Sequence, residues 1–221
     1  MKAVKHISLM SLFVILLSFL LASCSSSTSL QKVSMREIFK IIEYKEEKVL
    51  IYIHGSGDTP SVWAEDKVNK FGGVALDWSL ASANKLQAPK NGYEIGKDIG
   101  LLLNQKNENR DLLLIAHSAG AWVVQGIADS IENKDLVEII FLDPFTASSI
   151  FTPLKGSRML GKNAREVSTY YTSLDPIPFT NGKVNRGNRI KVDDSIVIDG
   201  KKRDAHWDVI DVYFNEYFKG Y

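Results

Sequence analysis

Ser118 is the residue of this chain whose neighbours best suit covalent chemistry. It lies in Ala116-His117-Ser118-Ala119-Gly120, between an apolar run that predicts a buried strand and a small, apolar run that predicts a helix. A serine at a helix N-terminus faces the positive end of the helix dipole, and the backbone N–H of Ala119 is placed to hold an oxyanion. A serine that only caps a helix is the plainer alternative.

The segment resembles the nucleophile elbow of the α/β-hydrolases, G-x-S-x-G, with Ala116 in the place of the first glycine. The resemblance implies that Ser118 is a nucleophile. Residues 54–57, with the sequence His-Gly-Ser-Gly, follow an earlier apolar run and resemble the oxyanion loop of lipases and esterases. This second resemblance implies that the backbone N–H of Ser56 completes the oxyanion hole with that of Ala119.

A serine hydroxyl needs a base that takes its proton. His54 belongs to the glycine loop, and His117 adjoins Ser118, so its side chain is expected to point away from the serine. His206 follows Ser118 in the chain, as the catalytic histidine does in the α/β-hydrolases, just before the last expected helix. The resemblance therefore implies that His206 is the base; a surface histidine in a turn is the alternative.

Two aspartates are candidates for the acid that orients His206. Asp143 ends one expected strand in a Leu-Asp-Pro sequence, similar to the acid of pancreatic-type lipases. Asp175 ends the next in Asp-Pro-Ile-Pro, similar to the Asp-x-x-Pro acid of fungal triacylglycerol lipases. We favour Asp175, because its strand lies one step further from the elbow and its loop leads on towards His206. Asp143 remains the alternative.

The elements that must position these residues alternate between strand and helix from about residue 36. Short apolar runs predict strands at 48–53, 73–78, 111–116, 137–142 and 166–171, with edge strands within 190–198. Helical spacing predicts helices at 61–71, 93–103, 119–131 and 209–218, although Gly96 and Gly100 weaken the second. This order predicts a single α/β domain over residues 36–221, an α/β-hydrolase fold with a mostly parallel sheet, helices on both faces and little or no cap.

The segment from Phe145 to Lys162 lies between two expected strands on the side of the site. Its apolar residues form either a small lid or a connection packed on the core. The resemblance implies a lipid-anchored carboxylic ester hydrolase, an esterase or lipase that acts through an acyl-enzyme. Two alternatives remain: an inactive envelope lipoprotein that serves as a binding or scaffold module, and an amidase or peptidase with the same triad.

The N-terminal sequence is typical of a targeting segment. A basic start at Lys2 and Lys5 precedes an apolar run at 7–22, which is typical of a signal peptide. The run ends in Leu-Ala-Ser-Cys, which resembles the lipobox of bacterial lipoproteins, and Cys24 is the only cysteine. An ordinary secretory signal is the alternative.

The lipobox resemblance implies a removed signal peptide at 1–23, a lipidated Cys24 and a serine-rich tether at 24–35. It places the protein in the bacterial cell envelope, and the serine after the cysteine favours the outer membrane where the cell has one. One cysteine allows no internal disulfide.

The remaining composition limits the partners. The chain has 221 residues with 45% hydrophobic and 24% charged residues, and its net charge is +1. This balance gives no electrostatic reason to expect nucleic acid. We expect a monomer that takes an acyl ester or a lipid-like small molecule. We expect no cofactor and no metal, because the sequence holds no His-x-x-x-His pair and no cysteine cluster.

Overall fold

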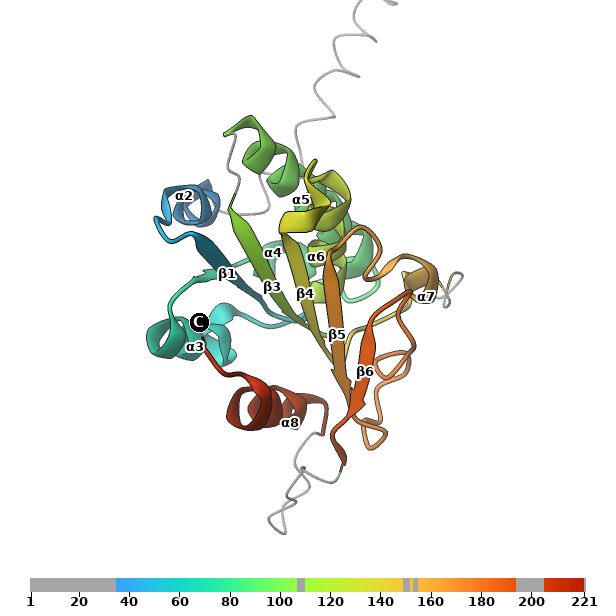
Figure 1. Ribbon diagram of the computed structural model, residues 1–221. Helices are drawn as coiled ribbons and strands as arrows, with labels where there is room; N and C mark the ends of the chain where they lie inside the picture. The colour runs from blue at the N-terminus through green and yellow to red at the C-terminus, as the bar shows by residue number, and fades with distance from the viewer. Residues whose placement is uncertain (1–34, 107–109, 149–151, 153–154, 194–204, 221) are drawn as a thin grey trace, which may run out of the picture.

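The molecule is built on a twisted sheet of six strands that are all parallel to their neighbours (Figure 1). The computed structural model describes residues 35–106, 110–148, 152, 155–193 and 205–220. The strand order is β2-β1-β3-β4-β5-β6. The strands are β1 (Lys48–Ile53), β2 (Val74–Leu76), β3 (Asp111–His117), β4 (Val137–Leu142), β5 (Glu166–Tyr171) and β6 (Asn188–Lys191).

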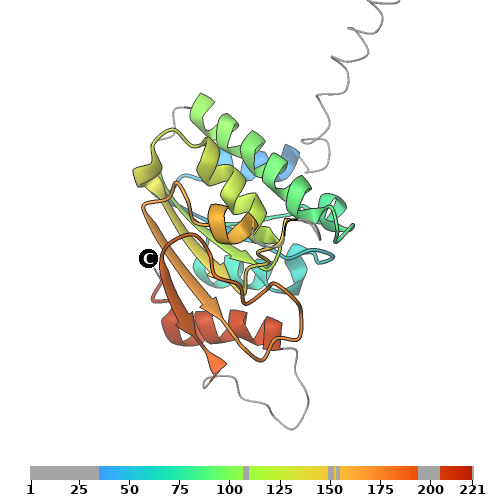
Figure 2. The same cartoon turned by 90° about the vertical axis from the view of Figure 1, so that its right-hand side faces the viewer.

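Helices cover both faces of the sheet (Figure 2). On one face α2 (Met35–Glu43), α5 (Ala88–Gln105) and α6 (Gly120–Ser130) share a core with β1, β3 and β4. On the other face α3 (Ala64–Phe71) and α8 (Ala205–Val212) enclose a second core. Shorter pieces are α4 (Ser79–Ser82), α7 (Lys155–Met159), the 3₁₀ turns Pro60–Val62 and Lys134–Leu136, and a π-helical turn at Tyr213–Tyr217.

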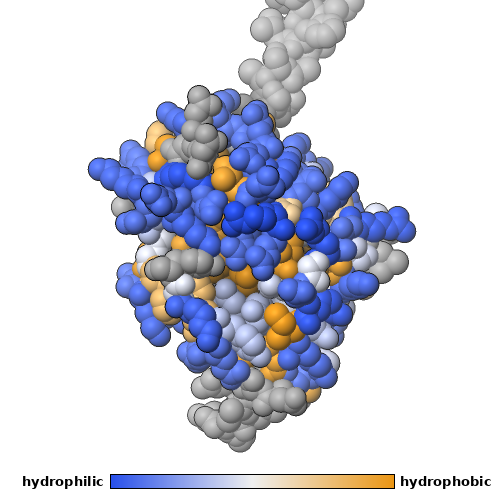
Figure 3. Space-filling view, in the orientation of Figure 1, coloured by the Kyte–Doolittle hydropathy of each residue, from blue (hydrophilic) through white to orange (hydrophobic). Residues whose placement is uncertain are grey.

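Burial on both faces explains why the central strands are continuous apolar runs. In β1, Val49 and Ile51 belong to the core under α5 and α6, whereas Leu50 and Tyr52 belong to the core under α3 and α8. Burying a side chain of this size stabilises the fold by about 1.5–3 kcal/mol. The outer surface is mainly hydrophilic with scattered hydrophobic patches in the view of Figure 3. Within the described residues, no helix has the length and apolar character needed to span a membrane.

Helices α5 and α6 pack so closely that glycine is required at their contact. A Cβ on Gly96 would lie 2.0 Å from the carbonyl oxygen of Val123, and one on Gly126 would lie 2.2 Å from that of Tyr93. Gly96, which weakens the predicted helix as an isolated segment, is therefore the residue that lets α5 sit against α6. This close packing holds α6, whose first turn follows Ser118, firmly on the sheet.

The predicted fold class is confirmed, and β1, β4 and β5 have their predicted bounds. The predicted start of the last helix at residue 209 was wrong. Helix α8 begins at Ala205, since Ala205 and His206 are buried and the helix must start early enough to place them. The expected strand at 73–78 is shorter, and part of the 190–198 region and the whole leader lie outside the described residues.

Candidate active site

The turn between β3 and α6 holds Ser118 in a strained backbone conformation. Its φ is +53°, a region that non-glycine residues rarely adopt. The Ser118 N–H donates to the carbonyl of Leu142 at 3.1 Å, which ties the turn to the end of β4. A Cβ on Gly120 would lie 2.7 Å from the carbonyl oxygen of His54, so the small residue after the turn is a steric requirement. Strain of this kind persists where the surrounding structure imposes it, commonly at functional sites.

The loop at 54–57 lies against this turn, as the sequence implies for an oxyanion loop. A Cβ on Gly55 would lie 3.1 Å from the Cβ of Ser118. Ser56 and Ala119 line the same pocket as Ser118, and among the described residues their backbone N–H groups have no hydrogen-bond acceptor. Two unpaired N–H groups beside a serine are what an oxyanion hole requires.

The other two histidines near the site, His54 and His117, are buried and make hydrogen bonds that hold the surrounding backbone. His54 is buried, the indole N–H of Trp78 donates to its carbonyl at 2.9 Å, and burial lowers the pKa of its ring. The His117 Nε2 lies 3.0 Å from the carbonyl oxygen of His206, to which it donates. His117 therefore positions the backbone of His206, a role that the sequence did not suggest.

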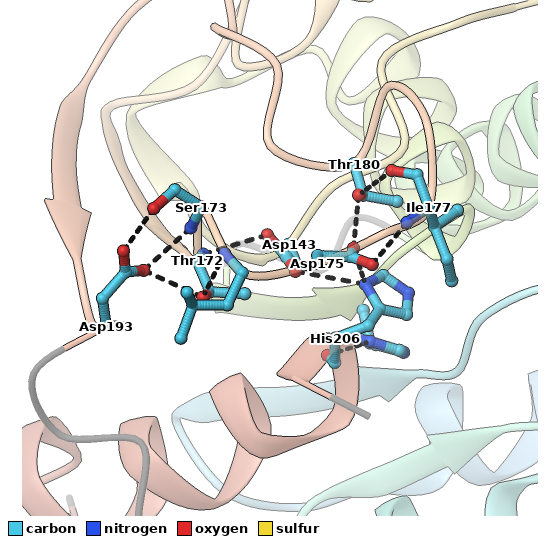
Figure 4. Close-up of polar contacts among 10 residues, drawn as sticks. Asp143, Thr172, Ser173, Asp175, Ile177, Thr180, Asp193 and His206 are labelled. Atoms are coloured by element: carbon cyan, nitrogen blue, oxygen red, sulfur yellow. Dashed lines mark hydrogen bonds and ion pairs between the residues drawn. The ribbon is translucent and has the colours of Figure 1, made fainter. Parts of the chain in front are cut away.

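His206 lies in the first turn of α8 with its Nδ1 facing two carboxylates (Figure 4). Asp175 Oδ2 lies 2.8 Å from Nδ1. Asp143 Oδ2 lies 3.2 Å from the same nitrogen in hydrogen-bond geometry. Both aspartates favoured or considered from the sequence thus reach one atom. Since both carboxylates contact Nδ1, the other ring nitrogen, Nε2, is the one that would exchange a proton with a serine.

Asp143 is held by the end of β4. Its side chain is fully buried and its φ is +46°. Its backbone N–H donates to the carbonyl of Tyr170 at 2.8 Å, and its Oδ1 accepts from the N–H of Thr172 at 3.3 Å. Among the described residues, this long contact is the only hydrogen bond to its carboxylate apart from that of His206.

Asp175 is held by the loop that follows β5. Its Oδ1 accepts from the backbone N–H of Ile177 at 2.7 Å, and its Oδ2 contacts the buried hydroxyl of Thr180 (Figure 4). The start of this loop is fixed by Asp193, which accepts from the hydroxyl of Thr172 and the N–H of Ser173, each at 2.8 Å. Asp193 therefore supports the segment that carries Asp175.

The three side chains have very different proton affinities. Burial raises the pKa of Asp143 to about 6, although His206 opposes the change. Burial also acts to raise the pKa of Asp175, but hydrogen bonds from His206, Thr180 and Ile177 outweigh it and lower the pKa to about 2. Burial acts to lower the pKa of His206, whereas the hydrogen bonds and charges of both aspartates raise it to about 9. A protonated His206 is therefore strongly favoured at neutral pH.

Ser118 and His206 line one pocket of about 270 Å³. Its walls combine apolar side chains (Phe145, Ile177 and Trp207) with charged ones (Asp58 and Lys85). Phe145 also packs against the core. The start of the segment after β4 therefore both lines the pocket and packs on the core. A larger hollow of about 550 Å³ lies by α2, α3 and β2 and contains none of these candidates.

Asp143, Asp175 and His206 are also the one group of metal-type ligands found in the described residues, with their ligand atoms within 4.8 Å of one another. A backbone N–H already donates to each carboxylate, and a hydroxyl also donates to Asp175, an arrangement that suits aspartates orienting an imidazole. Cys24 lies outside the described residues.

No family model matches the chain, and no curated protein is similar to it in sequence. Among solved structures it is similar to Aspergillus fumigatus lipase B, with 12% identity and a TM-score of 0.46, over 66% of this chain and 45% of the lipase. A lipase-esterase related protein from Clostridium acetobutylicum has 12% identity and a TM-score of 0.44, over 76% and 92% of the two chains.

The histone deacetylase Clr3 is also similar, with 11% identity and a TM-score of 0.44, over 77% of this chain and 31% of that one. The chain thus spans less than half of lipase B and of Clr3.

Proposed function

We propose that this protein is a serine hydrolase that cleaves carboxylic esters through an acyl-enzyme. Ser118 is the nucleophile, His206 the base, and Asp175, assisted by Asp143, orients the base. One observation carries the proposal. Ser118, on a strained strand-to-helix turn, lines the same pocket as His206, and Nδ1 of His206 contacts two buried carboxylates.

The chemistry follows from this arrangement. Ser118 Oγ attacks the ester carbonyl carbon while its proton passes to Nε2 of His206, and the resulting oxyanion accepts hydrogen bonds from the N–H groups of Ser56 and Ala119. The tetrahedral intermediate breaks its C–O bond, and the alcohol leaves with the proton from Nε2. Water then attacks the acyl-enzyme with His206 again as base, which releases the carboxylic acid and regenerates the Ser118 hydroxyl.

The nucleophile is tested with a fluorophosphonate probe on the purified domain that begins at residue 35. Wild type and the exposed-serine control Ser61→Ala should be labelled, whereas Ser118→Ala should not. A screen of short-chain to long-chain acyl esters on the same samples then separates an esterase from a lipase. Equal labelling of Ser118→Ala, or no hydrolysis of any ester by a folded wild type, would contradict the proposal and favour a binding or scaffold module.

We further propose that Cys24 carries the lipid anchor of a bacterial envelope protein. The support is the Leu-Ala-Ser-Cys sequence after a basic and apolar leader, with Cys24 as the only cysteine. Metabolic labelling with a fatty-acid analogue should mark the wild type and not Cys24→Ala. Equal labelling of both would refute the anchor and leave the proposal for the site unaffected.

A further inference from the structure

Asp58 is a charged residue at the site that the proposed mechanism does not use. It follows the loop at 54–57 and lines the pocket with Ser118 and His206. Its position relative to the serine follows from the crowding at Gly55, which is too close to both residues to carry a side chain. A Cβ placed there would lie 2.9 Å from Asp58 Oδ2 and 3.1 Å from the Cβ of Ser118. The carboxylate therefore folds back over the loop and lies beside the nucleophile.

The Asp58 carboxylate has no donor of its own. Within the described part of the chain, it takes neither a hydrogen bond nor an ion pair, in contrast to Asp143 and Asp175. It is nevertheless partly buried, and this burial raises its pKa to about 6, against the opposing charges of His206 and Lys85. A partly buried carboxylate without a hydrogen-bond donor is unfavourable. A donor supplied by a bound ligand would therefore stabilise the complex at this position.

His117 carries a second acceptor near Gly55. His117 Nδ1 is buried, has no hydrogen-bond partner among the described residues, and lies 3.3 Å from the same Cβ position on Gly55. Since Nε2 of His117 donates to the carbonyl of His206 and burial holds the pKa of the ring well below its usual value, the ring is neutral and Nδ1 is an acceptor. Because this nitrogen is buried and His117 is not among the residues that line the pocket, Asp58 is the acceptor that a bound substrate can reach.

We propose that Asp58 is a substrate-recognition residue that accepts a hydrogen bond from a hydroxyl or amino group carried by the substrate next to its scissile ester. The inference rests on the proposed esterase function and narrows its substrate class to small, donor-bearing esters. The pocket of about 270 Å³, with apolar walls and a charged edge, fits such a compact polar ester.

Lys85 explains why the recognised group need not be a cation. Its Cε lies 3.5 Å from a Cβ position on Gly57, at the edge of the same pocket, and its charge acts on Asp58. A positive charge there offsets part of the attraction of Asp58 for an ammonium group, whereas a neutral hydroxyl donor keeps its full hydrogen bond. Hydroxyl-bearing and amino-bearing esters are therefore both included, and the experiment separates them.

The test compares esters that differ in one donor. 2-Hydroxyethyl butyrate and 2-methoxyethyl butyrate place the difference on the alcohol, and ethyl glycinate and ethyl propionate place it on the acyl group. Butyrylcholine supplies a charge without a donor. For each pair, the ratio of kcat/KM for the donor-bearing ester to that for its partner is measured in wild type, Asp58→Leu, Asp58→Asn and the exposed-acid control Asp66→Asn.

In Asp58→Leu, at least one ratio should fall about 10- to 100-fold, as expected for losing a hydrogen bond to a charged acceptor. Asp58→Asn, which keeps a neutral acceptor, should show a smaller fall, and Asp66→Asn should show none. The pair that responds identifies the source of the donor. Unchanged ratios in both Asp58 variants would overturn the inference, as would an equal fall in kcat/KM for butyrylcholine, which has no donor. Ester hydrolysis itself would still support the proposed function.

Discussion

The two aspartates at His206 come from regions of opposite character. Asp143 stands at the end of β4 inside the sheet, where its carboxylate is fully buried and accepts one long hydrogen bond from the backbone. Asp175 stands on a surface loop whose neighbours Leu174, Ile177 and Phe179 are exposed, yet its carboxylate accepts from a backbone N–H and contacts a hydroxyl. The aspartate on the more exposed loop, Asp175, thus accepts more hydrogen bonds than the aspartate inside the sheet, Asp143.

The difference shows that hydrogen-bond donors, more than position in the fold, decide which carboxylate stays ionised. Burial is the largest influence on both, and it raises the pKa of Asp143 to about 6. The donors around Asp175 reverse it and lower that pKa to about 2. Asp175 is therefore a permanent negative charge over the working pH range, whereas Asp143 loses its charge in mild acid.

The largest effect is expected when both carboxylates are removed. Asp143→Asn with Asp175→Asn should lower kcat by about 10⁴-fold, by analogy with the Asp-to-Asn loss in serine proteases. Asp175→Asn alone should cost less, about 10²-fold to 10³-fold, because Asp143 still accepts from Nδ1, and Asp143→Asn alone should cost least. Steady-state kinetics on one ester, with circular dichroism for folding and Asp211→Asn as an exposed control, measure the series.

Two results would contradict these roles of Asp143 and Asp175. A loss in Asp175→Asn as large as that in the double variant would mean that Asp143 does not orient His206. The reverse, with Asp143→Asn as costly as the double variant, would make Asp143 the principal acid and Asp175 a loop residue.

The sequence predicted most of the sheet because its central strands are buried on both faces and read as uninterrupted apolar runs. The turn at Ser118 was predictable because the contacts there exclude larger residues. The choice between Asp143 and Asp175 was not, because each follows a strand end next to a proline and only the path of α8 decides what His206 faces.

Two further features depend on contacts distant in sequence. The hydrogen bond from His117 to the carbonyl of His206 joins residues that are 89 positions apart, and Asp193 supports Thr172 and Ser173 from 21 and 20 positions away. No local pattern carries such information. The position of the Asp58 carboxylate, which has no hydrogen-bond donor among the described residues, likewise depends on how the loop at 54–57 packs against Ser118.

An effect of intermediate size is expected in the pH profile of kcat/KM. His206 must lose its proton to act as a base, and its pKa of about 9 means that kcat/KM should rise with pH, with the midpoint of the rise near pH 9. Asp143→Asn removes one of the groups that raise this pKa, so the midpoint of the rise should move to lower pH. A purely structural role for Asp143 would lower the plateau and leave the midpoint in place, which kcat/KM measured from pH 5.5 to 10.5 distinguishes.

The smallest effect concerns Thr180, the buried residue whose hydroxyl contacts Asp175 Oδ2 and lies 2.8 Å from the carbonyl of Ile177. Thr180→Val keeps the shape and removes one donor from Asp175, so kcat should fall about 5- to 10-fold, as expected for one hydrogen bond. The matched control is Thr146→Val. It removes a hydroxyl that donates to the carbonyl of Phe179 in the same loop at 2.8 Å without touching Asp175.

A double-mutant cycle turns this small effect into a test of the two carboxylates. When Asp143 is present, it can still accept the hydrogen bond of His206 Nδ1 if Asp175 loses its contact with Thr180. The loss of kcat in Thr180→Val is therefore smaller. In the Asp143→Asn background that neighbour no longer carries a charge, and the same Thr180→Val change should cost several-fold more. Thr146→Val should cost the same in both backgrounds. Equal losses for Thr180→Val in the two backgrounds would show that the aspartates act independently, however close they lie to one nitrogen.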